Sequence, residues 1–587
     1  MDRNTVLAIG LSTLVIIGGF TLQSKLFPTA EKPQSASRAD AVKIEDTAAG
    51  AQSSGAIDPV SIEAVSASPS SLEAEASDTA ETFVIETDLV RVTFTNKGGD
   101  IVSYKLKEHL DKGEPVEMAG GTADGNRAFS LLLGSVNGTA VDQIFSVKRI
   151  SDTEIGFFRP MIVKKADGSE ARFTLVKQYR FVPGEYLFEL KITVDGDREL
   201  QGLAFGDAAY TLRASPRFGP DWDVKQDKYE YRKYFHLLNG KKKSVTVNQG
   251  QSKAVADKFT WAAVAGKYFT IVAIPENFIQ GVSYSSAFAA DGTANSQLLL
   301  VHQPIEGSRN TDVWRFYVGP RTDKQLAKYN VVGNNAFKLG DANINEMVES
   351  SGILAPLEML LKWFMELFYK LVPNWGVSII LMTILMRIVI FPLTKKSSEA
   401  THKMQEHAPK MQEIQDKYRG NPQKLNEELA KFYKESGYNP LSGCLPLLIQ
   451  FPLIFAMYNL FNNYFEFRGA MFIPGWIPDL SRGDSVMLFP FSLPFLGDNL
   501  RILPIIYVVS QLLFGKVTQT PTANQQNSSM KFMMYGMPLV FFFLFYNAPA
   551  GLLLYWTFSN VLTLGQQVII NRMMESRKPA GLELVKK

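Results

Sequence analysis

The sequence predicts a polytopic α-helical membrane protein that also carries a large antiparallel β-sandwich domain outside the cytoplasm. Three observations lead to this fold class: apolar runs of membrane-spanning length, a long stretch of alternating apolar and polar residues, and an uneven distribution of basic residues among the loops. The averages hide all three, because 587 residues with 46% hydrophobic residues and a net charge of +3 would also suit a large soluble protein.

The N-terminal part of the chain predicts an anchor followed by a tether. Thr5–Leu22 is a run of eighteen residues without a charge, between Arg3 and Lys25. This length suits a transmembrane helix of about 20 residues and exceeds the roughly 7–15 residues of a signal-peptide core. We expect residues 1–27 to be an uncleaved signal anchor, with a cleaved secretory signal as the alternative. Residues 28–82 are rich in Ala, Ser, Pro and Glu, so they are expected to be a disordered tether.

Residues 83–340 have the pattern of a β domain. Short runs with period-two alternation are separated by Gly, Asn and Asp, as at the turn signal Asn96–Gly99. Examples of these runs are Phe83–Ile85, Val90–Phe94, Phe188–Ile192 and Tyr268–Ala273. About 250 residues of this texture predict one large antiparallel β-sandwich.

Residues 341–374 are predicted to be a linker and an amphipathic helix at the membrane interface. Glu358, Lys362, Glu366 and Lys370 recur every four residues, which places them in one stripe on a helix that is otherwise apolar.

Residues 375–571 are predicted to be a core of five membrane-spanning helices, which makes six spans with the N-terminal anchor. The apolar segments are Val377–Leu393, Gly443 to about Asn462, about Leu500–Gly515, Met533–Tyr546 and Gly551–Ile570. The segment that ends at Gly515 is short and contains Pro504, so the pattern leaves its limits open.

The basic residues predict the orientation of these spans. Segments 394–442 and 516–531 and the tail after Asn571 together contain sixteen Lys and Arg residues, whereas 464–499 and the turn 547–550 contain two. Because cytoplasmic loops carry the excess of Lys and Arg, the first group is expected in the cytoplasm. Both termini, including a basic tail at 572–587, would then be cytoplasmic and the β domain would lie on the opposite side.

Arg387 is the candidate functional residue. A charge well inside an apolar span costs about 2.5–3.5 kcal/mol on insertion scales, and such residues usually face a bundle interior or a hydrated cavity. The alternative is that its long stem carries the guanidinium to the membrane surface. Polar residues in four spans favour a hydrated cavity over interhelical hydrogen bonding alone. They are Thr383, Gln450, Gln511 beside Ser510, and a stripe of Trp556, Asn560, Thr563 and Gln567 with Ser559 and Gln566 beside it.

Residues 395–438 are predicted to form a cytoplasmic helical hairpin with a break at Gly420–Pro422. The apolar positions of both arms follow a four–three spacing, which is typical of helices packed along a seam. The hairpin is either a solvated pair held by its own seam or a docking arm for a ribosome or targeting factor that uses its basic face.

Several kinds of chemistry are excluded by composition. The single Cys444 rules out an intramolecular disulfide and a multi-cysteine metal site, and five scattered histidines leave little material for a metal centre. No stretch fits the phosphate-binding pattern G-x-x-x-x-G-K-[ST]. We therefore expect no cofactor, no metal, no catalytic residue and no enzymatic activity.

Three stretches resemble the YidC/Oxa/Alb family of membrane protein insertases, in the Gram-negative form with a large periplasmic domain. They are Asn374–Gly376 through Arg387 to Pro392–Lys395, Asn439–Pro452, and Pro549–Asn560. The family commonly has two aromatic residues, often both tyrosine, where this chain has Tyr555 and Trp556, so one hydroxyl is missing.

The resemblance implies a hydrophilic groove in the inner leaflet, open to cytoplasm and lipid and closed toward the periplasm, with Arg387 inside it. It also implies a periplasmic β-supersandwich that resembles sugar-binding folds, a location in the bacterial inner membrane, and the Sec translocon as a partner. The expected function is that of an insertase and chaperone for nascent membrane proteins, which works within the lipid bilayer. The ribosome and signal-recognition machinery would dock on the hairpin and tail. Two alternatives stay open: an anion transporter or channel, and a membrane-tethered sugar-binding domain.

Overall fold

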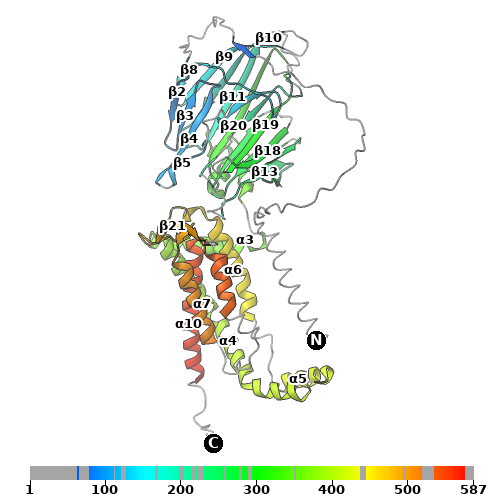
Figure 1. Cartoon of the computed structure of the whole chain (residues 1–587), viewed down its shortest axis with the longest axis vertical. Coiled ribbons are helices and arrows are strands. Elements are labelled where there is room, and N and C mark those ends of the chain that lie inside the picture. The colour runs from blue at the N-terminus through cyan, green and yellow to red at the C-terminus, as the bar shows by residue number, and fades with distance from the viewer. Residues whose placement is uncertain are drawn as a thin grey trace. The chain divides into compact units, whose positions relative to one another are not determined.

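The computed structural model describes residues 62–64 and 79–575 with some gaps, and the chain divides into a β unit that ends at Val348 and a helical unit that begins at Glu349 (Figure 1). The gaps are 112, 121–126, 165–169, 197–203, 206, 215–217, 221, 223–228, 257–258, 277–280, 289–293, 306, 349–351, 419, 437–444, 494–495 and 519–534. The predicted anchor, most of the predicted tether and most of the basic tail lie outside the described residues.

The described strands of the β unit form three antiparallel sheets. The ten-stranded sheet has the order β1 (Ile62–Ala64), β9 (Glu154–Lys164), β10 (Glu170–Arg180), β11 (Leu187–Gly196), β20 (Arg309–Pro320), β17 (Phe269–Pro275), β16 (Trp261–Ala265), β13 (Lys233–Leu238) and β14 (Lys241–Val245), with β8 (Ser146–Ser151) also on β9. The six-stranded sheet runs β15 (Gln251–Val255), β18 (Gly281–Phe288), β19 (Ala294–His302), β12 (Tyr210–Arg213), β6 (Ser130–Leu133) and β7 (Thr139–Ala140). The four-stranded sheet runs β2 (Thr82–Glu86), β3 (Val90–Thr95), β4 (Asp100–Asp111) and β5 (Glu114–Glu117).

This pairing agrees with the antiparallel β domain that the alternating pattern predicts. The four example runs lie in β2, β3, β11 and at the start of β17. The structure differs at one place: Ile62–Ala64, inside the predicted tether, pairs with Val163–Met161 of β9. An unpaired edge strand offers free N–H and C=O groups, so a short extended segment can add to it whatever its composition.

Aromatic side chains join the sheets of the β unit. The ring centroids of Phe94 and Tyr179 are 4.9 Å apart, and those of Tyr234 and Tyr284 are 5.4 Å apart. Rings of this size bury large apolar areas and favour tilted and edge-to-face contacts, so they supply much of the stabilisation between the layers.

A buried ionic cluster lies where the four-stranded sheet meets β10. Lys177 and Asp100 are both fully buried, and the Lys177 ammonium donates to Asp100 Oδ1 at 2.5 Å and to the Phe129 carbonyl at 2.8 Å. Arg127 donates to Asp100 Oδ2 at 3.0 Å and also pairs with Asp142. Burial raises the pKa of Asp100 and lowers that of Lys177, while the attraction between the two charges opposes both shifts.

We predict that Lys177→Met destabilises the β unit by about 3–5 kcal/mol, because it leaves the buried Asp100 without its ammonium partner. Pulse proteolysis of the full chain in urea, with cleavage in the β unit as the readout, measures this change. Lys191→Met, at an exposed position of the neighbouring strand β11, is the matched control. A shift for Lys177→Met no larger than that of the control would contradict the prediction.

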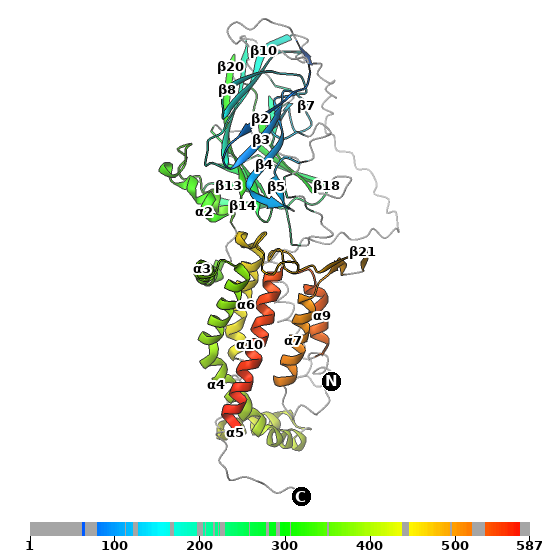
Figure 2. The same cartoon turned by 90° about the vertical axis from the view of Figure 1, so that its left-hand side faces the viewer.

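The helical unit consists of the amphipathic helix α3, several apolar helices, and the charged helix α5 (Figure 2). Its described helices are α3 (Ala355–Leu371), α4 (Trp375–Lys417), α5 (Pro422–Ser436), α6 (Leu445–Asn463), α7 (Leu503–Thr518), α9 (Met537–Phe545) and α10 (Ala550–Glu575). The β unit also contains the short helix α2 (Asp323–Ala327). Asn374 caps α4, since its Oδ1 accepts a hydrogen bond from the Val377 N–H at 3.1 Å.

Helix α3 has the two-sided character that its sequence predicts. Leu361 and Met365 are fully buried, whereas Met359, Trp363 and Leu371 are exposed. The charged stripe also makes specific contacts, because Glu358 accepts from Asn459 at 2.9 Å and Glu366 from the Tyr464 hydroxyl at 3.1 Å.

Among the described residues, one helical stretch, Trp375–Glu399, is long and apolar enough to cross a membrane, and Leu503–Lys516 is a shorter apolar helix. The six-span topology stays a prediction. The predicted span Val377–Leu393 and the first arm of the predicted hairpin form one continuous helix, α4. The break before Pro422 is observed, and the His407 ring lies 5.5 Å from that of Phe432 in α5.

Candidate functional site

Helix α10 contacts Arg387 at both its side chain and its backbone. Arg387 donates from Nη2 to the Ser559 hydroxyl, and Gln566 donates from Nε2 to the Arg387 carbonyl at 3.0 Å. No other described side chain accepts a hydrogen bond from this guanidinium. The Ser559 carbonyl accepts a hydrogen bond from the Thr563 hydroxyl of the same helix. Arg387 therefore faces α10, and other N–H groups of its guanidinium have no acceptor among the described residues.

The contact between α4 and α10 continues about three turns further along α4. Ser398 donates to Gln567 Oε1 at 3.2 Å, and Gln567 in turn donates to Asn571 Oδ1 at 2.9 Å. We call the line of polar contacts from Ser559 through Gln566 to Gln567 the polar seam. Val561 and Val568, each two residues past a seam residue, lie on another face of α10 and are exposed.

A second set of polar contacts joins α10 to α7. Asn560 donates from Nδ2 to Ser510 Oγ at 2.9 Å, and the Ser510 hydroxyl donates to the Tyr507 carbonyl at 2.6 Å. Gln511 donates to the Tyr507 hydroxyl at 2.9 Å, and the Tyr507 ring lies 5.6 Å from that of Trp556. Asn560 thus reaches α7, whereas Ser559 reaches α4.

Two predicted site hydroxyls are satisfied inside their own helices. Thr383 is fully buried and donates to the Ile379 carbonyl at 2.6 Å, and Thr563 donates to the Ser559 carbonyl at 2.6 Å. Such bonds to the preceding turn are usual for threonine in apolar helices. Neither side chain is a described partner of Arg387.

The two aromatic residues Tyr555 and Trp556 lie in different surroundings. Tyr555 is 3% exposed and its ring lies 5.7 Å from that of Phe461 in α6, so it belongs to the core of the helical unit. Trp556 is partly exposed and packs 4.7 Å from the Phe545 ring of α9. Gln450 lies in α6, and its side chain is outside the described ones.

The structure thus brings Arg387 together with Ser559 and Gln566 rather than with all the predicted residues. The sequence pattern places both residues beside the predicted stripe rather than in it. Ser559 and Gln566 are seven residues apart, so they lie on one face of α10, one position from the stripe. Helical spacing is the sequence feature that could have identified them as site residues. Gln566 Oε1 and Thr557 Oγ1 are buried and have no partner among the described residues.

Sequence reasoning also missed Asp484, in the segment between α6 and α7. Asp484 is fully buried, and its Oδ2 accepts from the backbone N–H groups of Ile502 at 2.8 Å and Leu503 at 2.9 Å. The Trp476 indole donates to the same oxygen at 2.9 Å. A carboxylate on the first N–H groups of α7 satisfies donors that the helix cannot pair itself and complements the helix dipole.

The same segment caps α10 and packs on α4. The Ala550 N–H donates to the Arg482 carbonyl at 2.7 Å, and the Gly551 N–H donates to the Leu480 carbonyl at 2.9 Å. A side chain at Gly376 would meet the Phe472 ring at 2.1 Å, so glycine permits this close approach at the start of α4. One segment therefore joins the first turns of α4, α7 and α10 at one end of the helical unit.

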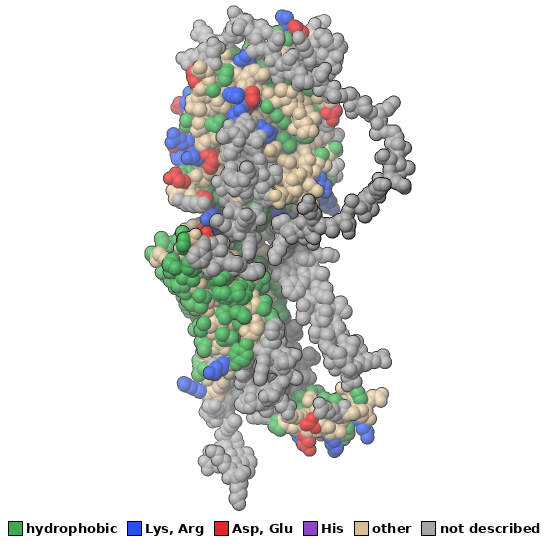
Figure 3. Space-filling model, viewed as in Figure 1, with side chains coloured by type: hydrophobic (Ala, Val, Ile, Leu, Met, Phe, Trp, Pro, Cys, Tyr) green, Lys and Arg blue, Asp and Glu red, His purple; other side chains and the backbone are tan. Residues whose placement is uncertain are grey.

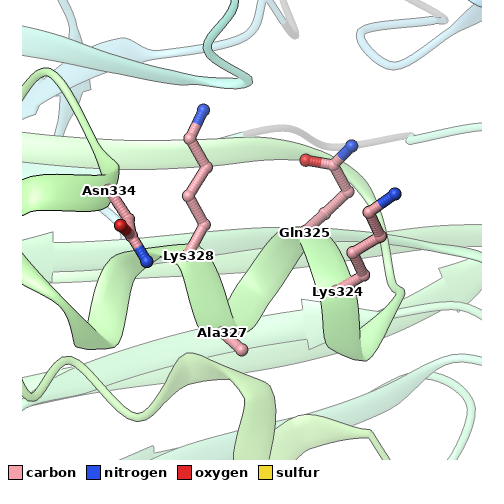
Figure 4. Close-up of a pocket in the computed structure, with 5 residues that line it drawn as sticks. All are labelled: Lys324, Gln325, Ala327, Lys328 and Asn334. Carbon is pink, nitrogen blue, oxygen red and sulfur yellow. The ribbon is translucent and has the colours of Figure 1, made fainter.

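A pocket in the β unit is unrelated to these features. Its volume is about 430 Å³, and Lys324, Gln325, Ala327, Lys328 and Asn334 line it (Figure 4). Lys328 is already paired with Glu185 at 2.9 Å and with the Gly184 carbonyl at 3.0 Å. Of the two lysines that line the pocket, Lys328 is therefore held by partners within the β unit.

Family models match both units of the chain. The model described as 60Kd inner membrane protein matches residues 367–578, and the model described as YidC periplasmic domain matches residues 82–341. The β-rich unit, the apolar helices and these matches define an inner-membrane protein with a periplasmic β domain.

Curated relatives extend the similarity over the whole chain. A membrane protein insertase YidC of Treponema denticola is 52% identical and covers 98% of this chain and 100% of its own length. One of Treponema pallidum is 42% identical with the same coverage. A solved structure of an active YidC insertase with its first transmembrane domain resolved is 16% identical, covers 84% of this chain and 93% of its own, and has a TM-score of 0.33. The chain belongs to the family of YidC membrane protein insertases, which confirms the resemblance seen in the sequence.

We predict that Asp484→Ala lowers the stability of the helical unit by about 1.5–3 kcal/mol, because three buried donors lose a charged acceptor. The change is measured as a lower thermal midpoint of the full chain in detergent, followed by fluorescence-detected size-exclusion chromatography. Glu413→Ala, at an exposed position of α4, serves as the control and should leave the midpoint unchanged. Equal midpoints for the two variants would show that Asp484 is not needed as a cap.

Proposed function

We propose that this chain is a membrane protein insertase and chaperone that receives nascent inner-membrane proteins at the polar seam and releases them into lipid. The identity of 52% to a curated insertase over nearly the whole chain carries this proposal. The contacts of Arg387 support a role for the seam, because a guanidinium among apolar helices is an unusual and costly feature.

The chemistry of the seam suits a polar or acidic segment of a substrate. Ser559 is the one described acceptor for the Arg387 side chain, so other N–H groups of the guanidinium can donate to a carboxylate. Away from bulk water, the attraction between the two charges is stronger and offsets part of the cost of holding the segment in the membrane. The reaction makes and breaks no covalent bond.

Polar groups around Arg387 would hold a hydrophilic groove open to water. The buried Gln566 Oε1 has unmet hydrogen-bonding capacity among the described residues, which favours hydration beside Arg387. Gln450, Gln511, Asn560, Thr383 and Thr563 are the further groove residues that we propose. Trp556 offers an aromatic surface to the apolar part of a substrate, while the buried Tyr555 packs against Phe461 of α6 beneath it.

Release would follow from partition of the apolar substrate segment into lipid. The membrane potential adds about 2.3 kcal/mol per charge per 100 mV to the movement of a charged tail. Figure 3 shows a mainly apolar surface over the described face of the helical unit, which suits direct exchange with the bilayer. The exposed apolar residues of α4 and α10 include Ile388, Val389, Val561 and Val568.

The topology and partners complete the proposal. The distribution of basic residues supports six spans, cytoplasmic termini and a periplasmic β domain. We propose the domains 1–27, 28–82, 83–340, 341–374, 375–571 and 572–587, with the cytoplasmic hairpin at 395–438. The hairpin and the basic tail would dock the ribosome and targeting factors, and insertion would proceed alone or with the Sec translocon.

We predict that Arg387→Ala lowers insertion of a substrate with an acidic tail by about tenfold or more, which corresponds to losing at least ~1.4 kcal/mol of attraction. Arg387→Lys should keep part of the activity, because it keeps the charge but not the fork of donors. Insertion into proteoliposomes, scored by protease protection of the tail, measures both. Lys396→Ala, near the end of the apolar stretch, controls for loss of any basic residue.

Two outcomes would reject parts of this proposal. Normal insertion by a folded Arg387→Ala variant would remove the arginine from the mechanism. Flux of chloride or phosphate through liposomes containing the wild-type chain, abolished by Arg387→Ala, would favour an anion transporter instead.

A further inference from the structure

The segment between α6 and α7 contains an apolar hairpin that the insertion mechanism does not use. Strands β21 (Met487–Leu493) and β22 (Gly497–Leu500) pair antiparallel, with Met487 opposite Leu500 and Leu493 opposite Gly497. Residues 486–496 contain no charged residue. The exposed fractions are 43% for Val486, 51% for Met487 and 68% for Leu488, so the apolar side chains at the start of the hairpin are exposed.

A two-stranded sheet has no core of its own in which to bury such residues. An isolated hairpin is marginally stable in water, and exposed contiguous apolar surface marks a site of contact with another apolar phase or partner. Pro490, inside β21, removes one backbone donor and limits pairing with a further strand. The hairpin is thus poorly suited to extending a sheet and well suited to presenting side chains.

The base of the hairpin is polar and fixed to the helices. Ser485 donates to Asn499 Oδ1 at 2.8 Å, and the Tyr546 hydroxyl donates to the Asn499 carbonyl at 2.8 Å. Arg501 donates from its N–H to the Tyr546 hydroxyl at 3.1 Å and from Nε to Asn547 Oδ1 at 3.2 Å. A polar base with an apolar projection is the arrangement expected at the boundary between lipid headgroups and acyl chains.

The position of the hairpin agrees with that boundary. Its segment caps α7 and α10 and packs on the start of α4, so the hairpin lies at the same end of the helical unit as α3, which leads into α4. Figures 1 and 2 both show β21 and α3 at that end, and Figure 2 shows them on opposite sides of the helices. Helix α3 likewise exposes Met359 at 72% and Trp363 at 56%.

The apolar surface also continues from the hairpin onto α7. Ile505, Ile506 and Val509, in the first two turns of that helix, are exposed by 43%, 37% and 50%. A protein partner usually leaves a rim of charged and polar residues around an apolar patch, whereas this run is uncharged over eleven residues and merges with the surface of an apolar helix.

We propose that the β21–β22 hairpin is a second interfacial membrane anchor, inserted into the lipid leaflet at the α3 end of the helical unit. Two anchors on opposite sides resist tilting of the helices better than one. They therefore fix the depth of Arg387, which lies about 18 Å along α4 from Trp375 at 1.5 Å per residue. This inference rests on the membrane placement of the helical unit in the proposed function.

Lipid quenching of a single fluorophore tests this anchor in the full-length chain. With Cys444 replaced by serine, bimane is attached at Leu488→Cys on the hairpin, at Val509→Cys on α7, or at Lys253→Cys on β15 of the β unit. Each protein is placed in nanodiscs of phosphatidylcholine and phosphatidylglycerol, with or without brominated acyl chains near the headgroup. We expect brominated lipid to reduce emission from positions 488 and 509 and not from position 253.

The outcomes separate this proposal from the one on which it rests. Quenching at 509 without quenching at 488 overturns the hairpin anchor and leaves the membrane placement intact. Absence of quenching at both positions rejects the membrane placement itself. Blue-shifted but unquenched emission at 488 indicates that protein, a second copy or another chain, covers the hairpin, which also overturns the assignment to lipid.

Discussion

A guanidinium held between apolar helices needs acceptors, and this requirement orders the contacts between α4 and α10. Ser559 accepts from the side chain of Arg387, and Gln566 donates to its carbonyl. An isolated charge inside an apolar span is costly, so its neighbours must offer polar groups or water. The polar seam on α10 is therefore best understood as the environment that makes Arg387 tolerable and leaves some of its donors free.

The first turns of α7 and α10 depend on a different electrostatic interaction, the pairing of their free backbone N–H groups. Asp484 places a buried carboxylate on the first turn of α7, and carbonyls of the same segment receive the first N–H groups of α10. Backbone donors at helix starts cannot be left unpaired near an apolar medium. The segment between α6 and α7 therefore pairs the first backbone donors of α7 and α10 within the protein.

The sequence predicted the classes of structure well, because composition and periodicity act over many residues. Alternation predicted the antiparallel strands, and a four-residue charge repeat predicted α3. The sequence also draws attention to Arg387, because a single charge stands out in an apolar run. Its role stays a prediction. Pairwise contacts were harder to predict. Whether Thr383 turns to Arg387 or to its own helix depends on a rotation about one bond, and the structure shows the bond to Ile379. Asp484 was missed because two of its three partners are backbone N–H groups, which leave no trace in the sequence.

The central proposal is that substrates pass along the polar seam beside Arg387. Site-specific photocrosslinking tests this most directly, with a benzophenone amino acid at Asn560, beside the seam, or at Val561, which is 52% exposed on another face of α10. A ribosome-stalled nascent membrane protein with an acidic tail is the target. The account predicts strong adducts from position 560, lost in Arg387→Ala, and weak ones from position 561. Equal labelling from both positions, or adducts from 561 alone, would contradict it.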